Sequence, residues 1–182
     1  YVQSNVPPFQ IIQTYLEFDE LEQTEFGGVI EKFKKGPNTM PGDASVHANS
    51  IRMCQFVKCN LIRLLTHAYF NKASVDHTII HSGAHNSLFA HWVQYLGVMK
   101  DVFDESGMNP DWIECDLVDS ILTAMLSYLE FAQTAPEFSG LTEEAIARRL
   151  IGDALSSEQY KPFEEMLWAF SDPECVDFSA GP

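Results

Sequence analysis

Residues 110–129 read PDWIECDLVDSILTAMLSYL, and the spacing of apolar side chains in this stretch decides the fold class. The apolar residues recur every three or four positions, which places them on one face of an α-helix. Pro110 suits the first helical position, because proline lacks the N–H group that the first turn leaves unpaired. The face consists of Ile113, Leu117, Ile121, Leu122, Met125 and Leu129. We therefore predict an amphipathic helix here.

Three segments that precede this stretch show the same spacing. Each has apolar residues three or four positions apart, with polar and charged residues between them. Glycines and prolines from Gly36-Pro37 through Pro41-Gly42 mark a loop between the first two segments. The stripes run through Phe9, Ile12, Leu16 and Leu21, then through Ile51, Cys54, Val57, Leu61, Leu64 and Leu65, and then through Phe89, Trp92, Val93, Leu96, Met99, Val102 and Phe103.

Further helices are expected after residue 140. Thr142 suits the start of one helix, and Ser156 or Ser157 suits the start of another, because hydroxyl side chains cap helix N-termini. No run of five residues alternates strictly between apolar and polar, and no Asn-Gly or Asp-Gly turn occurs, so nothing predicts a strand. We expect an all-α fold, a compact bundle of six to seven helices that forms one domain over residues 1–182.

The charge of the chain is strongly uneven. The sequence has 11 Lys and Arg against 26 Asp and Glu, a net charge of −15. Residues 1–100 hold eight acidic and eight basic side chains, whereas residues 101–182 hold 18 acidic and three basic ones, so the whole excess lies in the second half. Negative charge repels phosphate groups, so we expect no direct nucleic-acid partner and no docking on anionic lipid. No apolar stretch is long enough for membrane insertion.

Four acidic residues crowd the start of the predicted helix after Pro110. They are Asp111, Glu114, Asp116 and Asp119. The helix dipole favours acids at this end, which explains their position in part. An acidic helical face also suits a partner protein with a basic face, because complementary potentials speed the encounter and select the partner. We hypothesise that the acidic half, residues 101–182, binds such a partner through these acids. The chain could also form an oligomer or be one subunit of a larger assembly.

Short motifs of common catalytic sites are missing. The sequence has no G-x-S-x-G elbow, no P-loop and no G-x-G-x-x-G fingerprint, which favours a non-enzymatic function. The four cysteines, Cys54, Cys59, Cys115 and Cys175, lack zinc-finger spacing and are few for a disulfide framework. We expect free thiols, and from them a soluble protein of the cytoplasm or another intracellular compartment. A chain that starts at Tyr1 indicates a processed or partial protein.

Histidines form the most unusual cluster in the sequence. His77, His81 and His85 follow one another at intervals of four, so a continuous helix would place them on one face. Two histidines at this interval can chelate zinc or another transition metal. The sequence lacks the glutamate of the hydrolytic H-E-x-x-H motif, and Gly83 interrupts the segment. A metal site and a solvent-facing histidine stripe therefore both stay open.

The order of these segments resembles the globin superfamily over about residues 8–133. Tyr15 stands where the first globin helix carries an aromatic residue, and Phe33 to Pro37 reproduces the F-x-x-x-P run that follows it. His47 stands in the place of the distal histidine. His81 best matches the proximal one, because Trp92 lies eleven residues further on.

This resemblance implies a haem cofactor and a small gaseous ligand such as oxygen as an alternative function. His47, His81 and His85 are then the expected cofactor-binding residues, with the proximal imidazole on iron and the distal one donating to bound oxygen. The sequence departs from the family in three respects, one of which is that the spacing from His47 to His81 is longer than usual. Only nine residues separate Pro37 from His47, so the phenylalanine that packs on haem has no counterpart, and residues 134–182 lie outside the resemblance.

Overall fold

A computed structural model describes residues 6–26, 41–71, 84–104, 110, 112–142, 145, 146 and 149. Its long helices are α2 (Pro8–Phe26), α4 (Pro41–Leu65), α6 (Ala84–Asp104) and α7 (Trp112–Gln133). Helix α4 thus includes Pro41 and Gly42, which the sequence placed in the preceding loop; proline is compatible with a first helical turn. A π-helical turn, η1 (Thr66–Phe70), extends α4, and a 3-10 turn, η2 (Pro136–Phe138), follows α7. These residues contain no strand, so the predicted all-α class is confirmed. The predicted count of six to seven helices stays a prediction, since the described part holds four long ones.

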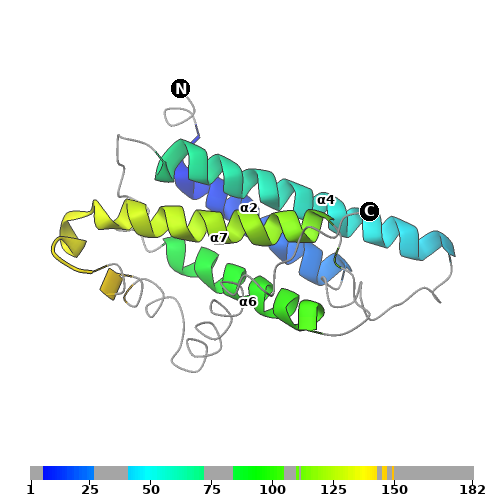
Figure 1. Ribbon diagram of the computed structural model, residues 1–182. Helices are drawn as coiled ribbons and strands as arrows, with labels where there is room; N and C mark the ends of the chain where they lie inside the picture. The colour runs from blue at the N-terminus through cyan, green and yellow to red at the C-terminus, as the bar shows by residue number, and fades with distance from the viewer. Residues whose placement is uncertain are drawn as a thin grey trace.

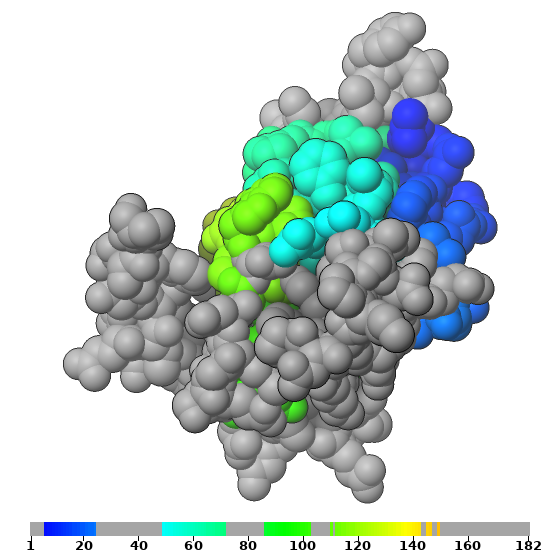
Figure 2. Space-filling view, turned by 90° about the vertical axis from the view of Figure 1, so that its right-hand side faces the viewer, coloured from blue at the N-terminus to red at the C-terminus, as the bar shows by residue number. Residues whose placement is uncertain are grey.

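The four long helices lie side by side as a bundle (Figure 1). Helix α2 packs against α4 and α6, and both of these also pack against α7, so that α2 and α7 lie across the bundle from each other. The end-on view of Figure 2 shows α4 between α2 on one side and α7 on the other. No helix among the described residues is long and apolar enough to cross a membrane.

Side-chain contacts fix the direction of each helix. On α4, Lys58 meets Asp19, whereas the hydroxyl of Tyr69 in η1 donates to the backbone carbonyl of Val6, so α2 and α4 run antiparallel. Helices α4 and α7 run parallel, because Cys59 meets Ser120 and Phe70, eleven residues later, meets Phe131. The start of α6 meets the end of α7, and these two helices are antiparallel.

Aromatic side chains fill the core near the end of the bundle where α2 and α6 begin. The ring of Tyr128 lies 5.0 Å from that of Phe70 and 5.2 Å from that of Phe89, both in edge-to-face geometry. Trp92, which is fully buried, packs on Phe89 at 5.5 Å. Such pairs add stability beyond the apolar area that they bury. This end of the bundle is therefore a conventional packed core.

The predicted stripe of α7 agrees with the structure. Four of its six residues are buried, and the other two, Leu122 and Leu129, are half-buried. The helix begins at Trp112, two residues after the proline that the sequence placed at its start. The spacing of apolar residues was therefore sufficient to predict both this helix and its inner face.

The structure corrects the predicted inner face of α2. The helix itself is present, and Ile12 of the predicted stripe is buried and Leu16 is half-buried, but Phe9 and Leu21 are 60% and 39% exposed. The buried face runs instead through Tyr15, Asp19 and Glu22, which follow one another at helical spacing. Hydrophobicity predicts this inner face only in part, because two of the buried side chains are carboxylates.

Substitution of Leu117 tests the assigned core. Leu117 on α7 is fully buried, so Leu117→Ala should lower the free energy of unfolding by about 2–5 kcal/mol, as is usual when a core leucine is truncated. The matched control is Leu126→Ala on the same helix, where the side chain is 60% exposed and the change should stay within about 0.5 kcal/mol. Urea unfolding followed by circular dichroism measures both values, and equal losses would contradict the assigned face.

Candidate functional site

A fully buried lysine lies in the middle of the bundle. The Lys58 Nζ atom on α4 is 2.6 Å from Asp19 Oδ1 and 2.8 Å from Glu22 Oε2, and both carboxylates come from α2. The rings of Tyr95 and Tyr15 lie 5.3 Å and 5.9 Å from the same atom, within the range of cation–π attraction. A charge removed from water requires such partners. These contacts explain why an ammonium group is tolerated here.

A histidine connects this cluster to the surface. His91 Nδ1 on α6 lies 2.5 Å from Asp19 Oδ2, and the His91 side chain is 36% exposed whereas that of Asp19 is 7% exposed. Asp19 therefore bridges a solvent-accessible imidazole and a buried ammonium. Three helices, α2, α4 and α6, are tied together by these polar contacts.

The two carboxylates that bind Lys58 differ in acidity. Burial alone would raise the pKa of Asp19, but the hydrogen bond with His91 and the charge of Lys58 outweigh burial and lower it. Burial raises the pKa of Glu22 and outweighs the opposing effect of Lys58, while the charges of Asp19 and Glu114 raise it further. The pKa of Asp19 is therefore shifted down and that of Glu22 is shifted up, although both carboxyls contact the same ammonium.

The cluster also stabilises the charge of its lysine. Burial lowers the pKa of Lys58, but its interactions with Tyr15, Glu22 and Asp19 outweigh burial and raise the pKa overall. Burial raises the pKa of the Tyr15 and Tyr95 hydroxyls, so both remain protonated. Lys58 is thus held as a cation and is poorly suited to act as a base or a nucleophile.

Some buried polar atoms near Lys58 have no hydrogen-bond partner within the described structure. They are the hydroxyl oxygen of Tyr95, the Oε1 atom of Glu22, and both amide atoms of Gln55, three residues before Lys58 on α4. Buried polar atoms are nearly always satisfied by protein or ordered water. Together with Lys58, Asp19 and Glu22, these atoms make the middle of the bundle a polar interior.

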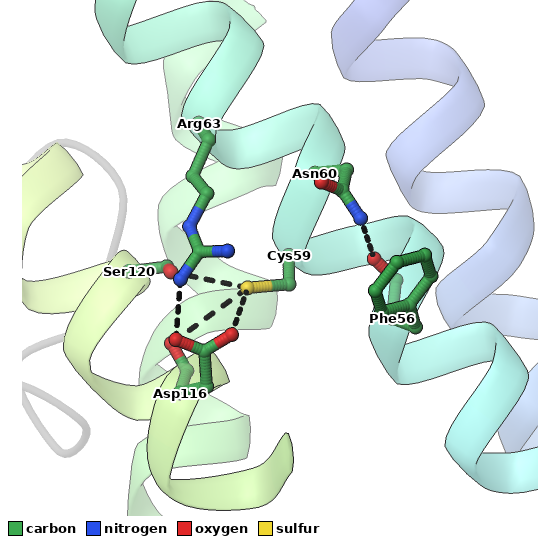
Figure 3. A network of polar contacts seen from close by, with 6 residues as sticks. All are labelled: Phe56, Cys59, Asn60, Arg63, Asp116 and Ser120. Atoms are coloured by element: carbon green, nitrogen blue, oxygen red, sulfur yellow. Dashed lines mark hydrogen bonds and ion pairs between the residues drawn. The ribbon is translucent and has the colours of Figure 1, made fainter.

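A second polar network joins α4 to α7 (Figure 3). The Cys59 sulfur lies 3.2 Å from Asp116 Oδ2 and 3.1 Å from Ser120 Oγ, while the Arg63 guanidinium pairs with the other oxygen of Asp116. Burial raises the pKa of the Cys59 thiol. A protonated, buried thiol is a weak donor and not an activated nucleophile. Cys54, Cys59 and Cys115 form no disulfide, as expected, and Cys175 lies outside the described residues.

The acids predicted to bind a partner occupy different environments. Glu114 is fully buried in the first turn of α7, and Asp116 is half-buried and bound to Arg63. Asp119 is exposed, and Asp111 lies outside the described residues. The structure therefore does not gather the described acids of this group on one exposed surface.

The predicted histidine ligands are only partly within the described structure. His77 and His81 lie outside it, while His47 lies in the first third of α4 and His85 is the second residue of α6. Since α4 and α6 start at opposite ends of the bundle, the structure does not bring His47 and His85 together (Figure 1). No group of three metal-ligating side chains occurs among the described residues. The haem and metal hypotheses stay predictions.

The outer face of α7 exposes two large apolar side chains. Trp112 is 70% exposed and Leu126 is 60% exposed. Asp119 lies midway between them at intervals of seven residues, so all three share one face of the helix. Glu130 is exposed one turn after Leu126, and the helix contains no Lys, Arg or His. This set, Trp112, Asp119, Leu126 and Glu130, is called the α7 face below.

Sequence reasoning missed both the buried cluster and the apolar part of the α7 face. A signal for the cluster existed, because Lys58 falls on the apolar stripe of its helix, four residues after Cys54 and four before Ile62. Trp112 was missed because it precedes the stripe that starts at Ile113. An ionisable residue within a stripe, or an aromatic residue beside one, is the pattern that would have identified them.

Comparison with known proteins gives no relative: no family model matches the chain, and no curated protein or solved structure matches it significantly. Function is therefore inferred from the residues of this chain alone. The buried cluster and the α7 face are the two features that distinguish the bundle from a plain helical scaffold.

Loss of the buried lysine should destabilise the protein strongly. Lys58→Met leaves two buried carboxylates without their cation, so the free energy of unfolding should fall by about 3–5 kcal/mol. Arg63→Met on the same helix is the control. The Arg63 side chain is 45% exposed, so its ion pair with Asp116 should contribute about 1 kcal/mol or less to the free energy of unfolding. Denaturant unfolding at neutral pH compares them. Similar losses in the two variants would contradict the assigned role of Lys58.

The lowered pKa of Asp19 predicts a specific acid sensitivity. A carboxyl whose pKa is lower in the folded than in the unfolded state stabilises the fold fully above its ordinary pKa of 3.8. This contribution is lost as the pH falls from 3.8 through the lower, folded-state pKa. Asp19→Asn should therefore flatten the acid limb of the stability curve, whereas Glu17→Gln, at an exposed position of α2, should not. Unchanged acid limbs in both variants would refute the assignment.

Proposed function

We propose that this chain is a non-enzymatic binding protein that engages a partner protein with a basic face, and that the α7 face is its contact surface. The observation that carries the proposal is the exposure of Trp112 and Leu126, 70% and 60%, on a helix that bears acids and no basic residue. The surface lies within the acidic half of the chain, residues 101–182.

The apolar part of the α7 face has the properties of an interaction surface. Single exposed apolar residues are ordinary, but here two large ones share one face of the same helix. Trp112 and Leu126 are 14 positions apart, which corresponds to about 21 Å along the axis. That length matches a partner helix laid along α7. Tryptophan is enriched among the residues that dominate binding energy, so Trp112 is the expected anchor.

The charge of the α7 face favours a basic partner. Asp119 and Glu130 are exposed, whereas the charge of Asp116 is matched by Arg63 within the molecule. Acids at the rim of an interface raise the association rate and select against acidic competitors. The apolar anchors would supply most of the affinity, and the acids would supply orientation and choice of partner.

The interior supports binding in preference to catalysis. Lys58 is held as a cation by two carboxylates, and the Cys59 thiol is kept protonated by burial. Both groups are engaged in joining helices. The described residues therefore support a rigid scaffold that presents a surface, either to a separate protein or to another subunit of a larger assembly.

Paired substitutions test the α7 face. The probe is a panel of synthetic amphipathic helical peptides with lysine on the polar face and leucine on the apolar face. Trp112→Ala with Leu126→Ala should weaken the tightest peptide at least about tenfold, since each residue is expected to contribute more than about 1 kcal/mol. The control, Phe9→Ala with Met53→Ala, removes two side chains that are 60% and 63% exposed on other helices, and should change the affinity less than about twofold.

Salt dependence tests the role of the acids. Isothermal titration calorimetry at about 50 mM and about 300 mM salt should show weaker binding at the higher concentration, because exposed charges are screened. Asp119→Asn with Glu130→Gln should reduce this difference. The proposed function would be overturned if the affinity for the peptide did not change with salt concentration, or if it did not change when Trp112 and Leu126 were replaced.

A further inference from the structure

We propose that the basic partner of the α7 face is a second copy of this chain, which contacts it through the outer side of α4. The inference rests on the function proposed for the α7 face and adds the identity of the partner. Its evidence is the charge of the long helices, the exposure of apolar side chains on α4, and the heights at which residues of α4 and α7 lie along the bundle.

Helix α4 is the basic helix among the four long helices that the structure describes. It carries three Lys and Arg residues against one acid, whereas each of the other three has more acids than bases. Over residues 51–71 the chain has Arg52, Lys58 and Arg63 and no Asp or Glu. Lys58 is buried against carboxylates, but both arginines are exposed. The chain thus contains the kind of basic surface that the α7 face is expected to bind.

The outer side of α4 also exposes large apolar side chains. Met53 is 63% exposed and Phe56 is 50% exposed. Further exposed residues follow them at helical spacing, so they share one side of the helix. This set, called the α4 face below, is Met53, Phe56, Asn60, Arg63 and His67. Apolar side chains and a base on one exposed side are what an amphipathic partner helix presents.

The α4 face and the α7 face begin at the same height along the bundle. The Cys59 sulfur contacts Asp116 and Ser120 at 3.2 Å and 3.1 Å, so Cys59 lies level with the midpoint between those two residues on the parallel helix α7. Met53 precedes Cys59 by six residues, and Trp112 precedes that midpoint by six. Both therefore lie about 9 Å before this contact, at the rise of an α-helix.

The same offset of 59 residues pairs the later positions of the two faces. Asn60 is level with Asp119, and His67 is level with Leu126. Each face therefore has exposed side chains at intervals of seven residues and at matching heights, with an acid on α7 where α4 has an amide and, within one turn, Arg63.

A two-fold axis parallel to the helices would make these faces meet. Such an axis preserves the height of every residue, so α7 of one copy lies parallel to α4 of the other and in register. Trp112 then meets Met53 and Phe56 of the second copy, and Asp119 lies within one turn of its Arg63. The same contact forms twice, which closes the assembly as a dimer.

Arg63 can serve both of its contacts. Its guanidinium pairs with Asp116 of its own chain, but this group has five N–H donors and the Arg63 side chain is 45% exposed. The carboxylate of Asp119 can therefore bind it without breaking the pair that joins α4 to α7. The tryptophan of the α7 face, packed on the apolar residues of the α4 face, supplies most of the affinity.

Sedimentation velocity of the full chain measures the association. We expect a dimer to form as the concentration rises from about 1 μM to about 100 μM. Met53→Ala with Phe56→Ala should weaken the dimer at least about tenfold, as should Trp112→Ala with Leu126→Ala. Phe9→Ala, which removes a side chain that is 60% exposed on α2, is the control and should change the dissociation constant less than about twofold.

Mixing the two double variants tests which faces meet. In an equal mixture one chain keeps its α7 face and the other keeps its α4 face, so one of the two contacts is intact and association should be tighter than for either variant alone. A wild-type chain that stays monomeric over this range, or an α4 double variant that associates like the wild type, would overturn the proposal.

A charge variant keeps the test decisive if the alanine variants do not fold, as judged by circular dichroism. Asp119→Asn with Glu130→Gln reduces the repulsion between two chains of net charge −15, so a general charge effect would strengthen association. Contact between Asp119 and the α4 face predicts weaker association instead. Unchanged or stronger association would contradict the proposal.

Peptide binding separates this inference from the proposed function. Met53→Ala with Phe56→Ala leaves the α7 face unchanged, so at concentrations where the chain is monomeric its affinity for the basic peptides should equal that of the wild type. A wild-type chain that never associates but still binds these peptides would overturn only the second copy as partner. A chain that neither associates nor binds the peptides would contradict both proposals.

Discussion

A lysine ammonium removed from water needs anions at contact distance, and the arrangement of this bundle follows from how Lys58 obtains them. Asp19 and Glu22 lie 2.6 Å and 2.8 Å from its Nζ atom, and His91 holds the outer oxygen of Asp19. Apolar contacts alone specify the register of two helices weakly. A shift of α2 against α4 by one turn would separate Lys58 from Asp19 and Glu22 and leave a buried charge unpaired. The cluster therefore selects one register for α2, α4 and α6.

Apolar spacing was sufficient to predict some of the fold and insufficient for the rest, and the difference has a physical basis. The inner face of α7 carries the apolar stripe of Ile113, Leu117, Ile121 and Met125, so its periodicity predicts both the helix and its orientation. The inner face of α2 contains Asp19 and Glu22, whose burial depends on Lys58 from a segment 36 or more residues away. A pattern within one helix cannot reveal a partner on another. The exposure of Trp112 was not predicted, because an aromatic residue next to an apolar stripe is ordinarily interpreted as part of the core.

The negative charge of residues 101–182 has more than one role in the described structure. Glu114 is buried, Asp116 binds Arg63 and Cys59 to join α7 to α4, and Asp119 and Glu130 face outward. The predicted acid cluster at the start of α7 thus divides between the interior and the surface. One helix therefore carries both the contacts that fix its position and the face that we propose for a partner.

The central claim is that Lys58 is a charged, water-excluded ammonium bound to two carboxylates. NMR of the protein with 15N-labelled lysine side chains observes this group directly, and Lys58→Arg identifies its signal. At neutral pH the account predicts a Lys58 ammonium signal with slow hydrogen exchange, since the side chain is 0% exposed and paired with Asp19 and Glu22. A Lys58 signal that exchanges as fast as those of solvent-exposed lysines, or that has the shift of a neutral amine, would contradict the account.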